Sequence, residues 1–275
     1  MIAGTIPESL SQLEKLTHLD LSCNKLQGPI PASFGTFKNL NVMWLGSNEL
    51  NGSLPISFGQ LSELVVLDVS RNHLIGILSE EHFSNHLEKL TFLDLSGNKL
   101  QGPIPASFGT FKKLREMWLG SNELNGSLPV SFGQLSELVF FLDLSNASIS
   151  GFIPKWFWNI SFNLSYLKLS HNQLQGQLPN SLKFSTKGVY LLDFSYNKFS
   201  GPIPLSIGES MLDLNYLFLS KNQLTGTIPD SIGHITSLQQ ENLLVKHFIK
   251  HIRGLPFAPA KWCGHPPCTT HAPKN

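Results

Sequence analysis

Large aromatic side chains recur at one position of the chain, between the two aliphatic residues of a repeated Leu-x-Leu pattern. Trp44, Trp118 and Phe218 occupy this position, which elsewhere holds aspartate or lysine. In an extended strand it faces away from the two aliphatic side chains, so these residues would point to solvent. Large aromatics held on a rigid surface are typical of protein-binding sites. We therefore predict recognition chemistry, with Trp44 and Trp118 as the leading candidates.

Other aromatic and charged residues are expected on the same surface, within the strands or next to them. With the two tryptophans they form the predicted ligand-binding set, in which the charged members would add complementarity to a partner. One alternative stays open: the aromatics pack on one another and bind nothing, and the second tryptophan reflects sequence duplication alone. The set is Trp44, Arg71, Phe92, Arg115, Glu116, Trp118, Tyr166, Lys168, Tyr190, Tyr216 and Phe218.

Asp68 and Asp94 occupy the same repeat position in consecutive repeats. As direct neighbours on adjacent strands, their like charges would repel and raise the pKa of one carboxyl group. Such a pair would suit a basic ligand or a metal ion. The alternative is that both are solvated residues of the repeat that form local hydrogen bonds.

The sequence does not favour catalysis. His82 and His86 have the spacing of a zinc-binding helix, but the catalytic glutamate that should follow the first histidine is missing. We find no glycine-rich phosphate loop and no Gly-x-Ser-x-Gly motif. We therefore predict a chain that is not an enzyme, with no cofactor and no metal site.

A repeat positions all of these residues. Ten glycines recur every 24 to 26 residues, and nine of them begin the phrase Gly-x-Ile/Leu-Pro; Gly76 is the exception, because Ser79 replaces the proline. A period of this length held over most of a chain indicates a stacked solenoid. The glycines are Gly4, Gly28, Gly52, Gly76, Gly102, Gly126, Gly151, Gly176, Gly201 and Gly226.

Each unit reads Leu-x-x-Leu-x-Leu-x-x-Asn-x-Leu-x-Gly-x-Ile-Pro, as in residues 90–105. This pattern predicts a leucine-rich repeat solenoid of about nine or ten repeats, with one parallel β-sheet on its concave face. The convex side should be irregular, with 3-10 or short helical segments, including one that begins near Ser79. We assign residues 1–240 to the solenoid and residues 241–275 to a non-repeat tail.

A recurring asparagine follows the strand of each unit. Its amide both donates and accepts, so a stacked row can satisfy buried backbone groups where the chain turns inward. Ala147 takes this position in one unit, and we expect a local distortion there. The predicted ladder is Asn24, Asn48, Asn72, Asn98, Asn122, Asn172, Asn197 and Asn222.

Charge and sorting signals limit the function classes. Only 14% of residues are charged and the formal net charge is +1, so we predict no nucleic-acid partner. The longest apolar stretch, residues 138–144, is too short to span a bilayer, and residues 1–7 lack a leader pattern.

Five Asn-x-Ser sequons predict glycosylation in a secretory compartment, although ordinary polar loops are the alternative. They begin at Asn51, Asn125, Asn146, Asn159 and Asn163.

The tail loses the repeat pattern, because Glu241 falls where a core leucine belongs. Residues 243–253 have an amphipathic pattern that predicts a helix covering the end of the solenoid, followed by disorder. The alternative is sequence unrelated to the repeat. Cys263 and Cys268 could form a disulfide, join His271 in a metal site, or remain free thiols.

The run from Gly4 to Leu238 resembles plant-type leucine-rich repeats, whose hallmark is Leu-x-Gly-x-Ile-Pro. Residues 145–158 and 78–83 resemble receptor-like proteins of the ethylene-inducing-xylanase receptor group. The resemblance implies a piece of a receptor ectodomain on the extracellular side of the plasma membrane, acting in defence or developmental signalling.

The partners that it implies are an extracellular protein, peptide or microbial elicitor, together with a co-receptor kinase. Two other functions stay open. The solenoid could inhibit a pathogen's cell-wall hydrolase, or it could be a truncated receptor fragment without function.

Overall fold

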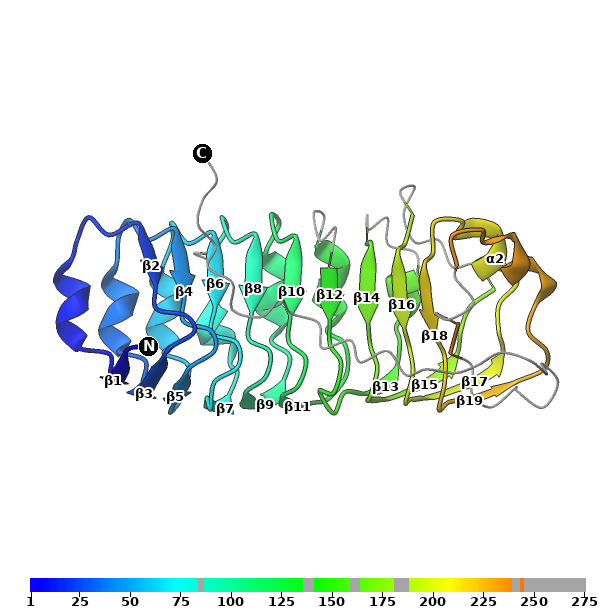
Figure 1. The fold of residues 1–275 in the computed structure, drawn as a ribbon, viewed down its shortest axis with the longest axis horizontal. Coiled ribbons are helices and arrows are strands. Elements are labelled where there is room, and N and C mark those ends of the chain that lie inside the picture. The colour runs from blue at the N-terminus through cyan, green and yellow to red at the C-terminus, as the bar shows by residue number, and fades with distance from the viewer. Residues whose placement is uncertain (84–86, 136–140, 159–163, 181–187, 239–242, 245–275) are drawn as a thin grey trace.

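The computed structural model of this chain is an elongated solenoid, described at residues 1–83, 87–135, 141–158, 164–180, 188–238 and 243–244. One strand from each coil joins a ten-stranded parallel sheet that runs the length of the molecule (Figure 1). We call it the concave sheet. Its strands, in spatial order, are β2 (His18–Asp20), β4 (Val42–Trp44), β6 (Val66–Asp68), β8 (Phe92–Asp94), β10 (Glu116–Trp118), β12 (Phe141–Asp143), β14 (Tyr166–Lys168), β16 (Leu191–Asp193), β18 (Tyr216–Phe218) and β20 (Leu243–Leu244).

The aliphatic side chains of the repeat hold these coils in register. Leu67 in β6 pairs with Leu93 in β8, and Leu93 with Met117 in β10; all three are fully buried. Burying one such side chain stabilises the fold by roughly 2 kcal/mol, and every coil contributes several. The predicted solenoid and its concave parallel sheet are therefore confirmed.

Three smaller parallel sheets, which the sequence analysis did not predict, lie along one side of the solenoid; we call them the lateral sheets. They use the Leu-x-Gly segment of each repeat, whose glycine has a positive φ. At Gly102 (φ 85°) an added Cβ would lie 2.7 Å from Ile77 Cγ2 of the preceding coil, so glycine also permits close stacking.

The lateral sheets run along the lower side in Figure 1. Their strands are β1 (Ala3–Thr5), β3 (Lys25–Pro29) and β5 (Glu49–Asn51); β7 (Ile75–Ile77), β9 (Lys99–Pro103) and β11 (Glu123–Asn125); and β13 (Ser150–Phe152), β15 (Gln173–Gln177), β17 (Lys198–Pro202) and β19 (Gln223–Thr225).

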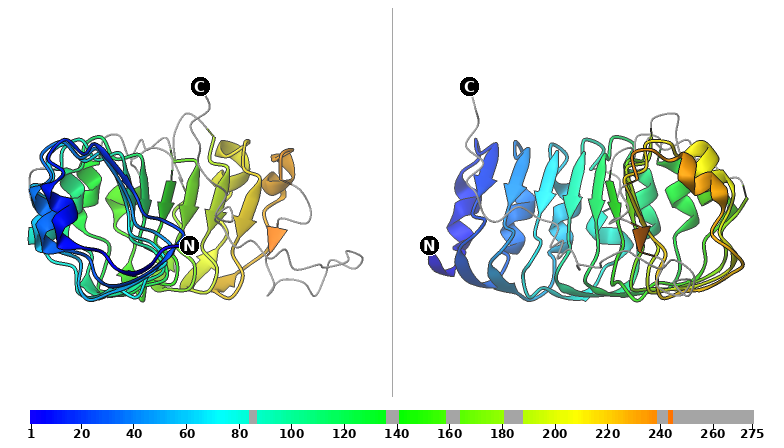
Figure 2. Two further views of the ribbon diagram at one scale, coloured as in Figure 1. Left: turned by 60° about the vertical axis from the view of Figure 1, so that its left-hand side comes forward. Right: turned by 45° about the vertical axis from the view of Figure 1, so that its right-hand side comes forward.

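Short helices cover the side opposite the concave sheet (Figure 2). Most are 3-10 helices that begin directly after the proline of the repeat, which suits proline because its missing N–H has no helical partner there. The helix expected near Ser79 is present as η4. The set is η1 (Glu8–Gln12), η2 (Ala32–Thr36), η3 (Ile56–Gln60), η4 (Glu80–Phe83), η5 (Ala106–Thr110), η6 (Val130–Gln134), α1 (Lys155–Trp158), α2 (Ser206–Ser210) and η7 (Asp230–His234).

The asparagine ladder is confirmed. Asn98 Oδ1 accepts a hydrogen bond from the Leu74 N–H of the preceding coil at 3.0 Å, while its Nδ2 donates to the Val69 and Leu95 carbonyls at 3.1 Å. At the missing rung, the Asn172 side chain accepts from both the Ala147 and Ile149 N–H groups. Ser148 takes a left-handed φ of 51° between them, so the expected distortion is present.

The C-terminal end differs from the prediction. Leu243 and Leu244 form β20 and pair with Leu217 and Phe218, so the helix expected over 243–253 does not begin at Leu243. The strand position lies two residues later in the sequence than expected, so Leu243, rather than Glu241, pairs with the core residue Leu217. The rest of that expected helix, and Cys263 and Cys268, lie outside the described residues.

Candidate functional site

A row of aromatic side chains crosses the concave sheet from β10 to β18. Trp118 stacks on Phe141 with ring centroids 3.6 Å apart, and Phe141 stacks on Tyr166 at 5.1 Å. The contacts continue through Tyr190 at 5.2 Å and Tyr216 at 5.5 Å, and Tyr216 reaches Phe218 at 6.3 Å. We call Trp118, Phe141, Tyr166, Tyr190, Tyr216 and Phe218 the aromatic row.

Five members of this row were predicted from the sequence, and Phe141 was missed. A one-residue insertion at Phe140-Phe141 obscured which phenylalanine belongs to the strand. Alignment on Leu142-Asp143-Leu144 identifies Phe141 as the strand residue, because Phe141 then occupies the same repeat position as Phe92 and Tyr166. In the structure Phe141 is the ring that connects Trp118 to the tyrosines.

The rings cover one another in part, as the alternative hypothesis expected. Trp118, Phe141 and Tyr166 are half-buried, whereas Tyr190 keeps 36% of its surface exposed. Trp118, Phe141 and Tyr166 stack on one another, whereas Tyr190 contacts its two neighbours at tilted angles. The exposed part of the row is a strip along the solenoid axis. Such a strip is a preformed apolar surface, since each ring is fixed by its neighbours.

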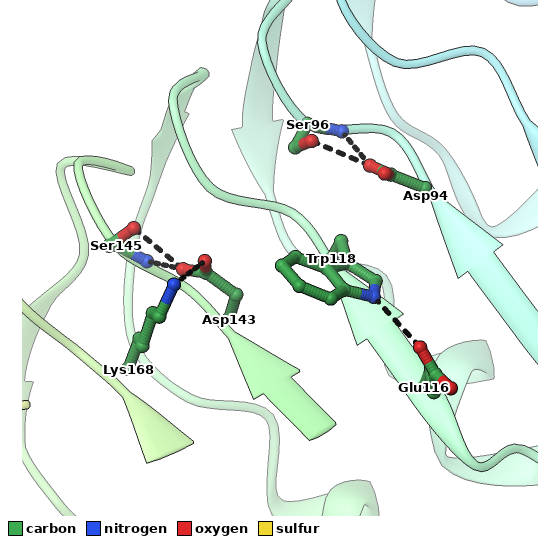
Figure 3. A network of polar contacts seen from close by, with 7 residues as sticks. All are labelled: Asp94, Ser96, Glu116, Trp118, Asp143, Ser145 and Lys168. Atoms are coloured by element: carbon green, nitrogen blue, oxygen red, sulfur yellow. Dashed lines mark hydrogen bonds and ion pairs between the residues drawn. The ribbon is translucent and has the colours of Figure 1, made fainter. Parts of the chain in front are cut away.

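Polar and charged partners fix Trp118 (Figure 3). Its Nε1 donates to Glu116 Oε2 at 3.4 Å, and Lys168 Nζ lies 5.8 Å from its ring centroid. The same ammonium lies 5.5 Å from the Phe141 ring and 3.7 Å from Asp143 Oδ2. Glu116 and Lys168, both predicted as ligand contacts, thus also hold the tryptophan within the protein.

Trp44 lies apart from the aromatic row, near the other end of the sheet. Its ring contacts Phe92, two strands away, at 5.4 Å between centroids and an interplanar angle of 54°. Asp68 pairs with Trp44 in register on the strand between them. The predicted Trp44 and Phe92 therefore form a second aromatic group on the same surface.

Asp68 and Asp94 are direct neighbours on β6 and β8, as predicted. Burial raises the pKa of Asp94 to about 7, and repulsion from Asp68 adds to the increase. Burial also raises the pKa of Asp68, and hydrogen bonds from Ser70 and the nearby Arg71 oppose it. The prediction of a raised pKa is confirmed, with burial as the larger cause.

The alternative hypothesis for these aspartates is half right. Asp94 Oδ1 accepts from the Ser96 N–H at 2.8 Å and from its hydroxyl at 2.6 Å, which are the expected local bonds. However, Asp94 is only 2% exposed and is not solvated. The described residues contain no group of three or more His, Cys, Asp or Glu side chains placed to hold a metal ion.

The other predicted residues border this surface. Arg115 and Tyr190 immediately precede β10 and β16. Arg71 has a φ of 50° and follows β6, at the edge of the concave sheet where the strands end, which we call the rim. The same rim carries a pair that sequence reasoning missed: His171 stacks on Tyr196 at 4.0 Å. His171 and Tyr196 each directly precede a ladder asparagine, and the residue at this repeat position has a left-handed backbone in every coil with a ladder asparagine. This shared repeat position is the signal that would have placed both residues on the rim.

Three of the sequon asparagines, Asn51, Asn125 and Asn146, are exposed. Asn51 and Asn125 end strands β5 and β11 of the lateral sheets, away from the aromatic row. Asn159 and Asn163 lie outside the described residues. No helix among the described residues has the length and apolar character needed to cross a bilayer.

Sequence comparison identifies the class of protein that this fold defines. The leucine-rich repeat family matches residues 14–74 as a block and six single repeats at residues 89–111, 113–135, 139–160, 163–184, 189–210 and 213–235. The chain belongs to the leucine-rich repeat family. No curated protein matches the sequence.

Among solved structures, the fold is similar to plant peptide-hormone receptors. RGFR1 in complex with RGF2 shares 32% identity with a TM-score of 0.79, over 86% of this chain and 37% of that one. The Arabidopsis receptor kinase HAESA, in complex with the peptide hormone IDA and the co-receptor SERK1, shares 34% identity with a TM-score of 0.71, over 86% and 42%. This chain thus spans less than half of either receptor chain.

A plant ice-binding protein is also similar, at 31% identity and a TM-score of 0.71, over 80% of this chain and 69% of that one. Solenoids of this kind therefore serve more than one function. The function has to be argued from side chains on the surface rather than from the fold.

Proposed function

We propose that this chain is a non-catalytic recognition module that binds an extracellular polypeptide or peptide along its aromatic row. The observation that carries the proposal is the continuity of the row across five coils, from Trp118 to Phe218. Aromatic side chains with a charged border supply both apolar burial and polar selectivity to a binding surface.

The similar receptors support the choice of ligand, since two of them were solved with peptide hormones. We place the module in the ectodomain of a plant cell-surface receptor-like protein, on the extracellular side of the plasma membrane. A co-receptor kinase is the second partner that this proposal includes, by analogy with the HAESA complex. The exposed Asn51, Asn125 and Asn146 are the proposed glycan acceptors.

A selection from a random peptide library on the immobilised chain tests the proposal. Selected peptides should bind the wild-type chain and lose about tenfold or more in affinity with Tyr190→Ala or Trp118→Ala. Tyr196→Ala is the matched control, because Tyr196 is 45% exposed, more than Tyr190 at 36%, and lies outside the row. Peptides that bind all of these variants equally would place recognition elsewhere and refute the site.

A further inference from the structure

Asn146 lies on the rim, where backbone hydrogen bonds to both neighbouring coils fix it. Its N–H donates to the Ser170 carbonyl at 2.8 Å, and its carbonyl accepts from the Asn122 N–H at 3.3 Å. Ala147 takes the ladder position of this coil, so the Asn146 amide does not serve as a rung. The backbone of Asn146 is therefore held in place while its side chain is exposed.

The sequon that Asn146 begins can carry a bulky group without disturbing the core. Asn146 and Ser148 are exposed, and the residue between them, Ala147, is fully buried. An N-linked glycan is large and polar and needs an acceptor on the surface. The two sequon positions that would be modified or recognised thus both point away from the packed interior.

The next two coils place an aromatic stack on the same rim. His171 and Tyr196 follow Asn146 at the rim position of successive coils, and their rings stack at 4.0 Å between centroids with planes 13° apart. This separation is close to the spacing of about 4.8 Å between neighbouring strands, so the stack runs along the solenoid axis. The imidazole face that Tyr196 does not contact is therefore turned toward the coil of Asn146.

That face of His171 suits a sugar ring. A pyranose presents C–H groups on one face, and these groups carry partial positive charge, whereas an aromatic ring is negative on its face. Both rings are exposed, and Tyr196 keeps 45% of its surface accessible. Contact with Tyr196 also holds the imidazole in one orientation before a sugar arrives. On the other side of Asn146 the rim residue is the small Ser121, which offers no such surface.

We propose that Asn146 carries an N-linked glycan whose first N-acetylglucosamine packs against the exposed face of His171 in the His171–Tyr196 stack. This assignment rests on the extracellular placement in the proposed function and gives a role to two rings outside the aromatic row. Because Asn146 follows β12 by three residues, the glycan would cover the rim beside Phe141 and limit the width of a ligand there.

The full chain, secreted from a eukaryotic host behind a cleavable leader, gives the test. Peptide mass spectrometry measures the occupancy of each sequon. The rate at which a peptide-N-glycosidase releases each glycan from the native protein then reports how well the first sugar is covered. We expect Asn146 to be occupied and His171→Ala to speed release at Asn146 about threefold or more. Tyr196→Phe is the matched control, because phenylalanine keeps the stack, and it should leave the rate unchanged.

Asn51 supplies a control within the same molecule. It lies in Asn51-Gly52-Ser53, where Asn51 pairs with Pro29 and Ser53 with Ile75, so neither in-register neighbour is aromatic. His171→Ala should not change release at Asn51. After the glycans are trimmed to a single N-acetylglucosamine, the His171 ring protons should show nuclear Overhauser contacts to the sugar, and Asn146→Gln should abolish them.

Three results would overturn the inference: an unoccupied Asn146 in a chain whose Asn51 is occupied, release at Asn146 that His171→Ala does not change, or no contact between the sugar and His171. Each of them would leave peptide binding along the aromatic row intact, because Trp118 and Tyr190 take no part in the measurement. If Asn51, Asn125 and Asn146 are all unoccupied, the result overturns this inference and contradicts the extracellular placement as well.

Discussion

Asp94 has an ionisable carboxyl group that is almost completely buried, beside the Asp68 carboxylate and in register with Trp118 on the next strand. The sequence predicts the acid pair, because both residues occupy the same position of successive repeats. It does not reveal the depth of burial, since that depends on how the side chains of neighbouring coils pack around the carboxyl group. The same limit explains why Lys168 was predicted as a free ligand contact and is found against Trp118 and Asp143.

We predict that Asp94→Asn changes the pH dependence of stability. The pKa of Asp94 rises from 3.8 to about 7 on folding, so the folded chain retains a proton that the unfolded chain loses in this range. Stability should therefore fall as pH rises from about 4 to about 7, by up to about 4 kcal/mol from this group. Asparagine has no such titration, so the variant should gain stability over the wild type across this window.

Thermal melts of both proteins between pH 4 and pH 8 measure this difference. Asp193→Asn is the control, because Asp193 makes the same hydrogen bonds to Ser195 at a less buried position. If the Asp94→Asn and wild-type melting curves stay parallel with pH, the buried carboxyl group does not titrate in this window.

At the scale of elements, the asparagine ladder and the concave strands were predicted, because each follows from a residue type at a fixed repeat position. The lateral sheets were not predicted. Their Leu-x-Gly-x-Ile-Pro segments contain glycine and proline, which indicate turns when a single repeat is read alone. Pairing becomes favourable only once the coils stack and bring those segments together.

Removing one central rung of the ladder should be costly. Asn98→Ala leaves the buried Leu74 N–H and the Val69 and Leu95 carbonyls without their side-chain partner. We expect a loss of about 3 kcal/mol in unfolding free energy, measured by urea denaturation. Asn24→Ala, at the partly exposed first rung, should cost about 1 kcal/mol; equal losses at both positions would contradict the burial argument.

Adding one methyl group to a convex helix, by a glycine-to-alanine substitution, should change the stability of the chain by an amount that depends on the position of the helix. A Cβ at Gly109 in η5 would overlap the backbone of Ser131 in the next coil, whereas a Cβ at Gly233 in η7 meets no atom of the described residues within 4 Å. Gly109→Ala should therefore destabilise the chain by about 1–3 kcal/mol. Gly233→Ala should be neutral or stabilise by up to about 1 kcal/mol, because alanine favours helix.

Denaturation of these two variants gives the comparison directly. The positions are equivalent in the repeat, so intrinsic helix preference is the same for both. A stable Gly109→Ala variant would mean that the convex helices stack less closely than the structure indicates.

At the scale of the whole molecule, the repeat period determines the architecture, and the architecture places residues from distant parts of the sequence on one surface. Trp118 and Phe218 belong to opposite ends of one aromatic row although about a hundred residues separate them in the sequence. The sequence predicts that these residues share a face. It does not predict that their rings form an unbroken series, because this depends on side-chain orientations and on the insertion at Phe141.

The same architecture limits what the fold can say about function. Similar solenoids are found in plant peptide-hormone receptors and in an ice-binding protein. What favours recognition of a polypeptide here is the arrangement on the concave sheet, with its aromatic row, charged border and acid pair. A test of the whole account must therefore ask where a ligand contacts the chain.

Photo-cross-linking answers that question most directly. A benzophenone amino acid replaces Tyr190 in the aromatic row or, as the control, Val130, which is 75% exposed on the convex helix η6. A peptide selected for binding to the wild-type chain should cross-link efficiently at position 190 and not at position 130. Cross-linking at position 130 alone, or equally at both positions, would contradict recognition along the concave sheet.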